Sequence, residues 1–161
     1  MPITTSNNLT GCAGEYSVCA ELCRHGLLAL ITPKNNPLFD VVATNPEGSD
    51  SVAIQVKTKS IKNKQGWKLG KDIETPQRNE DLFVVLADLR PDGRTDFYIY
   101  EYDVLSKRIR DLYADYMRTP KKDGGQRKEV GFRWFDLKYF TDDDKGRKNN
   151  WDLIEKKLKK A

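Results

Sequence analysis

Hydrophobic and polar positions follow two rhythms along the chain, and these predict a mixture of helices and strands. Apolar residues recur at helical spacing over 11–25, with Thr10 as the expected N-cap and Gly26 as the stop. Short alternating or continuous apolar runs predict strands over 27–31, 39–43, 51–58, 82–87, 97–100 and 132–135. Two further helices are expected over 103–110 and 151–158. This order predicts an α/β fold with a mixed central sheet flanked by helices.

The length of the chain corresponds to one domain. Chains of 161 residues bury roughly two-thirds of their unfolded surface in one core. We expect a single domain over 1–161, with its core over about 10–110 and a C-terminal extension over 111–161. Hydrophobic residues make up 38% of the sequence, which excludes wholesale disorder. No apolar run approaches the ~20 residues of a membrane span and the N-terminus lacks a signal pattern, so we expect a cytoplasmic protein.

Cysteine and histidine are too few for several common kinds of site. The 3 cysteines lie within one short segment and make no disulfide framework. Cys19 and Cys23 fall on one face of the first predicted helix, where we expect them to pack as small apolar side chains. The single histidine, His25, lies at the end of that helix in a capping position. One histidine argues against a Ser-His-Asp triad and against histidine-rich metal sites.

Positive charge gathers in one stretch of the chain. The net charge is +4, and six lysines lie within fifteen residues that contain no acid. Such a run is either a solvated loop or a surface for a polyanion, because each neutralised phosphate releases counterions. Trp67 within it either stacks on a base or packs at the edge of the core. The candidate nucleic-acid-binding residues are therefore Lys59, Lys62, Lys64, Trp67, Lys68 and Lys71.

Two other charged segments have simpler interpretations. The consecutive acids Asp142, Asp143 and Asp144 do not converge, and we expect them in a solvated loop. The strand over 132–135 is expected to alternate into the core with Arg133 exposed.

One acid of the first predicted helix lies on the apolar face. Glu15 precedes two apolar positions of that helix by three and four residues, a spacing that places all of them on one side. An ordinary first-turn acid, favoured by the helix dipole, is one explanation, and a functional carboxylate turned toward the sheet is the other. Asp40 lies in the second predicted strand. In the third, Gln55 and Lys57 project from one face because side chains alternate.

This arrangement resembles the PD-(D/E)XK nuclease superfamily, whose fold is restriction-endonuclease-like. The residues that carry the resemblance are Gly11, Gly14 and Glu15 in the helix, Asp40 in the second strand, and Gln55-Val56-Lys57-Thr58 in the third. Within the superfamily the chain looks most like the compact branch of archaeal Holliday-junction resolvases, where a Gly-Glu helix precedes strands with Asp and Glu-x-Lys. The likeness covers about residues 10–60 well, the next fifty only in strand order, and the last fifty not at all.

The resemblance implies a metal-dependent nuclease with nucleic acid, DNA above all, as its partner, and it is compatible with a homodimer. The implied ion is Mg²⁺, with Mn²⁺ as a substitute, because phosphodiester hydrolysis suits a hard cation held by oxygen ligands. Its implied ligands are Asp40, Gln55 and the backbone carbonyl of Val56, with Glu15 binding directly or through a water. Lys57 would orient or help deprotonate the attacking water. The implied catalytic residues are thus Glu15, Asp40, Gln55 and Lys57.

The chain departs from the superfamily at Gln55, where Glu or Asp is usual. An amide oxygen binds a hard cation more weakly than a carboxylate, so the site is expected to need high Mg²⁺, to work better with Mn²⁺, or to have lost catalysis. The alternative function is a catalytically silent module that keeps the nuclease fold and binds nucleic acid or a protein. Lys57 beside the inward acid opposes this alternative. A role in an immunity or toxin system is a third alternative, which depends on genomic neighbours.

Overall fold

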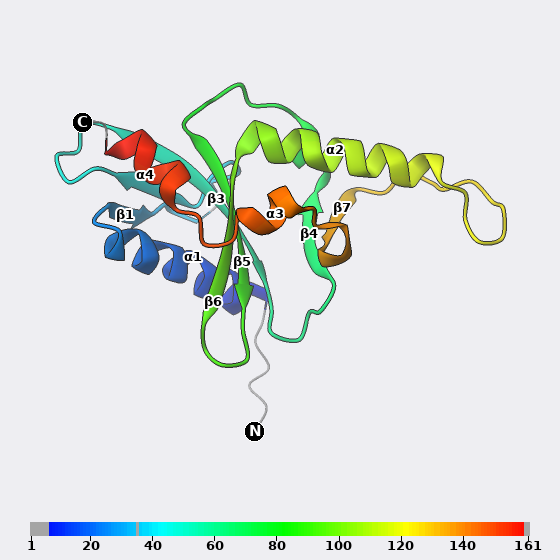
Figure 1. Cartoon of the computed structure of the whole chain (residues 1–161), viewed down its shortest axis with the longest axis horizontal. Helices are drawn as coiled ribbons and strands as arrows, with labels where there is room; N and C mark the ends of the chain where they lie inside the picture. Colours follow the sequence, from blue (N-terminus) through cyan, green and yellow to red (C-terminus); the bar gives the residue numbers. More distant parts are fainter. Residues whose placement is uncertain (1–6, 35, 160–161) are drawn as a thin grey trace.

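The computed structural model describes residues 7–34 and 36–159, and its centre is a five-stranded mixed sheet (Figure 1). The strands, in their order across the sheet, are β1 (Leu28–Ile31), β2 (Val41–Thr44), β3 (Ser51–Lys59), β5 (Leu82–Leu89) and β6 (Thr95–Glu101). β3 and β5 are parallel, and the other neighbours are antiparallel. The expected α/β fold with a mixed central sheet flanked by helices is confirmed.

Two helices cover one face of the sheet. They are α1 (Asn7–Arg24) and α4 (Asp152–Leu158), which pack on the central strands (Figure 1). Val18 and Leu22 of α1 and Ile154 of α4 are buried against residues such as Ile54 of β3. None of the helices in the described part of the chain is long and apolar enough to cross a membrane.

The other face is covered by α2 (Tyr102–Arg118) and by a two-stranded sheet of β4 (Gly66–Gly70) and β7 (Phe132–Asp136). Leu105 of α2, Trp67 of β4 and Phe135 of β7 share one core with Val84 of β5. Three short helices complete the fold: η1 (Lys71–Glu74), η2 (Leu137–Tyr139) and α3 (Asp142–Gly146). The residues beyond 110, expected as an extension, therefore contribute to both layers around the sheet.

The two ends of α1 differ in how well the sequence predicts them. Thr10 is already a buried helical residue, so it is not the N-cap; residues 1–6 lie outside the described residues. Gly26 ends the helix as predicted, with a left-handed φ of 78°. Its N–H donates to the carbonyl of Cys23 at 3.0 Å. The N–H of Leu27 donates to the carbonyl of Leu22 at 3.0 Å, which completes a Schellman motif.

Two charged residues that we expected at the surface are buried. Arg133 pairs with Glu74, which satisfies the guanidinium inside the protein. Asp144 lies in α3 and accepts hydrogen bonds from the Tyr100 hydroxyl at 2.8 Å and from Arg108 at 2.9 Å. Burial alone would raise the pKa of Asp144, but these hydrogen bonds bring that pKa below its usual value. Partners distant in the sequence thus decide the placement of both charges.

The packing of α1 on β3 requires glycine at one position. A Cβ atom at Gly14 would lie 1.8 Å from Oγ1 of Thr58, far inside van der Waals contact. This close approach fixes the depth of α1 on the sheet and therefore the position of Glu15, the next residue. Gly11 of the same helix has no atom within 4 Å of its Cβ position.

We expect Gly14→Ala to lower the free energy of unfolding by roughly 1–3 kcal/mol, the usual cost of overpacking, although alanine favours helix. Gly11→Ala is the matched control, and it should raise the same free energy by up to about 1 kcal/mol. Combining Gly14→Ala with Thr58→Ala should recover part of the loss, because Thr58 is the side chain that the new methyl group meets. Urea denaturation measures all these variants. Equal stabilities of the Gly14 and Gly11 variants would contradict the packing.

Candidate active site

Glu15 and Asp40 line one small cleft, which we call the acid cleft. Its volume is about 40 Å³, and the connection between β1 and β2 supplies the rest of its lining: Thr32, Pro33, Lys34 and Asn36. Glu15 is turned toward the sheet, and its side chain is 15% exposed. The structure thus brings together a helix acid and an acid that directly precedes β2, although strand 39–43 was predicted to include it.

A backbone hydrogen bond holds Asp40 in this position. The register of β2 with β3 ends where Val41 lies opposite Ile54. The N–H of Asp40 still donates to the Ile54 carbonyl at 2.9 Å. Beyond Ile54, β2 no longer supplies acceptors to β3. The N–H of Val56 donates instead to Oδ2 of Asp40, at 2.8 Å. A carboxylate has several acceptor positions, so this bond uses only part of its capacity.

The backbone carbonyl of Val56 is directed to the same side of β3. The N–H and C=O groups of one strand residue point toward the same neighbouring strand. Since the N–H of Val56 points to Asp40, its carbonyl is directed past the end of β2, on the Asp40 side. A backbone ligand for an ion at Asp40 would have to lie on this side.

Gln55 and Lys57 lie on the other face of β3. Ile54 and Val56 point into the core beneath α1, whereas Ala53 packs on the α2 side. Alternation places Gln55 and Lys57 with Ala53. Gln55 is buried and Lys57 is half-buried, and neither lines the acid cleft. Of the four predicted catalytic residues, the structure therefore gathers two in one cleft and places two across the strand from it.

Lys34 belongs to the acid cleft, although the sequence analysis did not single it out. Its Nζ donates to Sγ of Cys12 at 3.4 Å and to Oε2 of Glu15 at 3.3 Å, and these contacts raise the pKa of Lys34. The lysine side chain is 68% exposed, so solvent weakens this pair. A single lysine next to a proline belongs to no sequence pattern from which its place in the cleft could be predicted. Its position depends on Thr32, whose N–H closes the loop by donating to the Asp40 carbonyl at 2.9 Å.

Two residues of the lysine-rich stretch that we assigned to nucleic-acid binding are buried, so the assignment was wrong for them. Lys59 is 4% exposed and Trp67 is 2% exposed, so neither is available to a nucleic acid. Lys59 pairs with Asp88 and donates to the carbonyl of Asn63 at 2.8 Å. Trp67 is a core residue, and its indole N–H donates to the carbonyl of Ala87 at 3.1 Å.

Lys57 is half-buried, whereas four other lysines of the stretch are exposed: Lys62, Lys64, Lys68 and Lys71. Lys68 lies in β4, a strand that we did not predict, and its Nζ lies 4.3 Å from the centre of the Phe132 ring. Lys71 pairs with Glu129 at 2.8 Å. The alternation of Trp67 and Leu69 with lysine is the signal by which this strand could have been found.

The donor set around the acid cleft is sparse. The part of the chain that the structure describes holds no group of three or more His, Cys, Asp or Glu side chains placed to bind a metal ion. The available oxygen donors are the carboxylates of Glu15 and Asp40 and the carbonyl of Val56. Zinc favours thiolate and imidazole, and calcium takes roughly six to eight oxygens. Mg²⁺, which keeps several waters, fits this set better than either.

Comparison with known proteins shows a similarity of fold. The sequence matches none of the protein-family models, and no curated protein is similar to it at a significant level. Among solved structures, the fold is similar to that of a bacterial homing endonuclease, I-Ssp6803I, with a TM-score of 0.52 and 18% sequence identity. The similarity covers 94% of each chain, so it includes the C-terminal residues that the sequence resemblance left out.

We expect Lys59→Met to lower the free energy of unfolding by up to roughly 3–5 kcal/mol, because it leaves the buried Asp88 with only Arg90, at 3.4 Å, to balance its charge. Adding Asp88→Asn should recover much of this loss, since it removes the buried charge that Lys59 had neutralised. Lys64→Met is the control, an exposed lysine of the same stretch whose change should stay within about 0.5 kcal/mol. Denaturant titration checks the series. If the Lys59 and Lys64 variants unfold alike, the buried pair does not stabilise the fold.

Proposed function

We propose that this chain is a metal-dependent nuclease of the PD-(D/E)XK superfamily that hydrolyses phosphodiester bonds in DNA. The observation that carries the proposal is the meeting of Glu15 and Asp40 in one cleft, with Asp40 held on the backbone of β3 at Val56. The fold similarity to an endonuclease over 94% of each chain supports it.

The residues of the acid cleft suit a magnesium ion. Asp40 would bind it through its carboxylate, with the carbonyl of Val56 and, directly or through a water, Glu15 as further ligands. Gln55, which the sequence resemblance implied as a ligand, lies on the other face of β3 and is left out of this set. When bound, such an ion neutralises phosphate charge and lowers the pKa of a water, which phosphodiester hydrolysis requires near neutral pH. Mn²⁺ is the expected substitute, because the acid cleft supplies only two carboxylates among the described residues.

Lys57 is the proposed cation for the reacting phosphate. It follows Val56, the residue whose N–H holds Asp40, and it is half-buried. In the described part of the chain it has no ion-pair partner, whereas Lys59, two residues on, is neutralised by Asp88. An unpaired ammonium group at this position can stabilise developing charge and orient the attacking water.

The exposed lysines after β3 are the proposed contacts to the DNA backbone: Lys62, Lys64, Lys68 and Lys71. Phosphate contacts of this kind position a substrate without reading its sequence. A homodimer would supply the second active site that cleavage of both strands requires.

A catalytically silent nucleic-acid-binding or protein-interaction module is the second candidate, and one observation favours it. Gln55 stands where the superfamily usually has an acid, and the acid cleft has two carboxylates and no third among the described residues. Lys57 favours the nuclease, because a module that only binds has no need of a half-buried cation without an ion-pair partner among the described residues, directly after Val56, the residue that holds Asp40.

Incubation of the protein with supercoiled, linear, single-stranded and branched DNA tests the proposal. We expect cleavage with Mg²⁺ or Mn²⁺ and none with EDTA. Asp40→Asn should abolish cleavage, and Lys57→Met should slow it on the order of a hundredfold or more while DNA affinity stays nearly unchanged. Lys156→Met, an exposed lysine of α4, is the control and should cleave normally.

Equal thermal melting of these variants separates lost chemistry from misfolding. The nuclease proposal is wrong if the protein binds DNA but cleaves none of the four forms with either ion and leaves RNA intact. The silent module would then take its place.

A further inference from the structure

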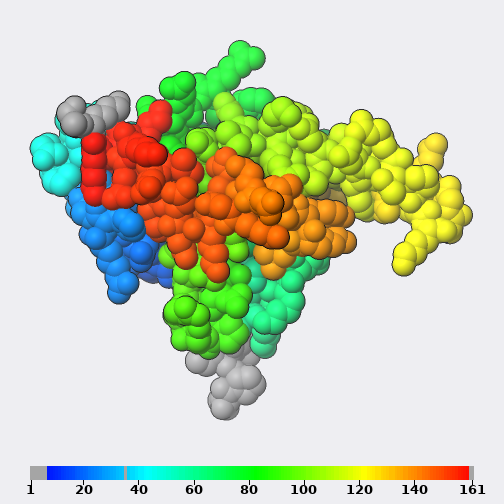
Figure 2. Space-filling view, viewed as in Figure 1, coloured from blue at the N-terminus to red at the C-terminus, as the bar shows by residue number. Residues whose placement is uncertain are grey.

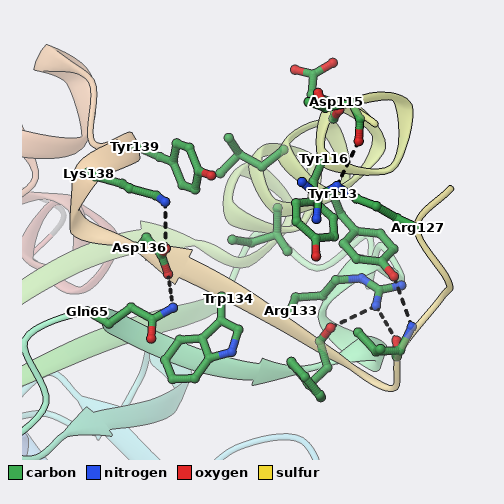
Figure 3. A pocket seen from close by; sticks show the side chains of 15 residues that line it. Gln65, Tyr113, Asp115, Tyr116, Arg127, Arg133, Trp134, Asp136, Lys138 and Tyr139 are labelled. Atoms are coloured by element: carbon green, nitrogen blue, oxygen red, sulfur yellow. Dashed lines mark hydrogen bonds and ion pairs between the residues drawn. The ribbon is translucent and has the colours of Figure 1, made fainter. Parts of the chain in front are cut away.

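A second and larger cleft lies on the α2 side of the molecule (Figure 3). It is formed by the C-terminal half of α2, the connection that follows it, and β7 with the residues after it. Its volume is about 660 Å³, within the range of roughly 300–1,000 Å³ that is typical of ligand sites. It shares no lining residue with the acid cleft, so it is a separate site.

We call this second cleft the aromatic cleft. Its lining includes four aromatic side chains that carry a polar group: Tyr113, Tyr116, Trp134 and Tyr139. Tyr113 and Tyr116 of α2 are stacked, with ring centroids 6.0 Å apart and an interplanar angle of 23°. Trp134 is only half-buried, whereas the other two tryptophans of the chain, Trp67 and Trp151, are buried. These rings offer flat surfaces at the edge of the solvent.

Cationic groups already lie over three of the rings: Arg127 over Tyr116 at 4.1 Å, Arg133 over Tyr113 at 3.4 Å, and Lys138 over Tyr139 at 5.0 Å. Arg133 is buried and paired with Glu74, so it stabilises the lining of the aromatic cleft and is not available to a ligand. Lys138 differs, because its side chain is largely exposed. Arg127 donates to the carbonyl of Thr119 at 2.8 Å through Nε, which leaves its other donors for a further acceptor.

One wall of the aromatic cleft carries a polar chain next to Trp134 (Figure 3). Gln65 donates to Oδ1 of Asp136 at 3.0 Å, and Nζ of Lys138 lies 3.7 Å from Oδ2 of Asp136. Amide, carboxylate and ammonium groups beside exposed rings are the combination that recognises unpaired bases, which stack on aromatic faces and expose their hydrogen-bonding edges.

The segment that forms the aromatic cleft is basic. Residues 113–139 carry seven Lys and Arg side chains against four Asp and Glu. The connection after α2 stands away from the body of the molecule (Figure 2), and Lys121, Lys122 and Lys128 on it are exposed. The charge therefore suits a polyanion that passes along this arm and over the cleft.

We propose that the aromatic cleft binds a segment of unpaired nucleotides. One or two bases stack on Trp134, Tyr139 and Tyr116, and the phosphates lie against Arg127, Lys138 and the exposed lysines of the connection. The choice of nucleic acid as ligand rests on the proposed function, and the site for unpaired bases adds to it. A protein segment suits the cleft less well, because its well-exposed hydrophobic side chains are two tyrosines and a single aliphatic residue, Val130.

Titration of the full chain with a single-stranded oligonucleotide in EDTA tests this proposal, because neither a metal nor cleavage takes part. We expect saturable quenching of tryptophan fluorescence, and Trp134→Phe should remove most of it, since Trp134 is the half-exposed tryptophan. Anisotropy of a labelled oligonucleotide should show a loss of affinity of roughly five- to a hundredfold for Trp134→Ala and for Tyr139→Ala, the equivalent of one stacked base.

One control outside the cleft and one further variant within it make the result specific. Tyr16→Ala removes an exposed ring from α1, outside the cleft, and should leave the affinity unchanged. Lys138→Met should reduce the slope of log affinity against log salt by about 0.7, the value for one phosphate contact on a single strand.

Three results would overturn the proposal. One is equal affinity of the wild type, Trp134→Ala and Tyr139→Ala. Another is an absence of binding to the oligonucleotide by protein that binds and cleaves duplex DNA. The third is concentration-dependent self-association that Tyr139→Ala abolishes, with no nucleotide bound, which would assign the cleft to a second copy of the chain. Trp134-dependent binding without any nuclease activity would instead contradict the proposed function and leave this site standing.

Discussion

The candidate site depends on the approach of α1 to β3 at a single point, where Gly14 lies against Thr58. Even a methyl group does not fit there without movement. Because Glu15 is the next residue, the contact that seats the helix on the sheet also turns an acid toward the acid cleft. The Gly-Glu pair therefore has a steric reason as well as a chemical one.

Asp40 reaches the same cleft because of a backbone hydrogen bond. Where β2 leaves β3, the N–H of Val56 loses its strand partner and the carboxylate of Asp40 replaces it. A buried N–H without a partner costs about 1–3 kcal/mol. The hydrogen bond that avoids this cost also fixes the position of the Asp40 carboxylate. Two carboxylates in a cleft of about 40 Å³ repel each other. Lys34 offsets part of that charge through Glu15, and a divalent cation would offset more.

The elements that sequence predicts well are those with a local signal. The end of α1 at Gly26 and the strands of the main sheet follow from spacing and turn residues alone. The burial of Lys59 and Arg133 depends on Asp88 and Glu74, partners that are distant in the sequence, so both charges were expected in solvent. The meeting of Glu15 and Asp40 was expected from the resemblance to a nuclease superfamily, but the part played by Lys34 depends on a loop closure that no periodicity reveals.

The proposed function requires a divalent ion at Asp40 in the acid cleft. Anomalous diffraction from crystals soaked in Mn²⁺ tests it most directly, because the signal locates the ion without reference to activity. We expect an anomalous peak within direct coordination distance of an Asp40 carboxylate oxygen, and no such peak in crystals of Asp40→Asn. An empty cleft in the wild type, or a peak that persists in Asp40→Asn, would contradict it.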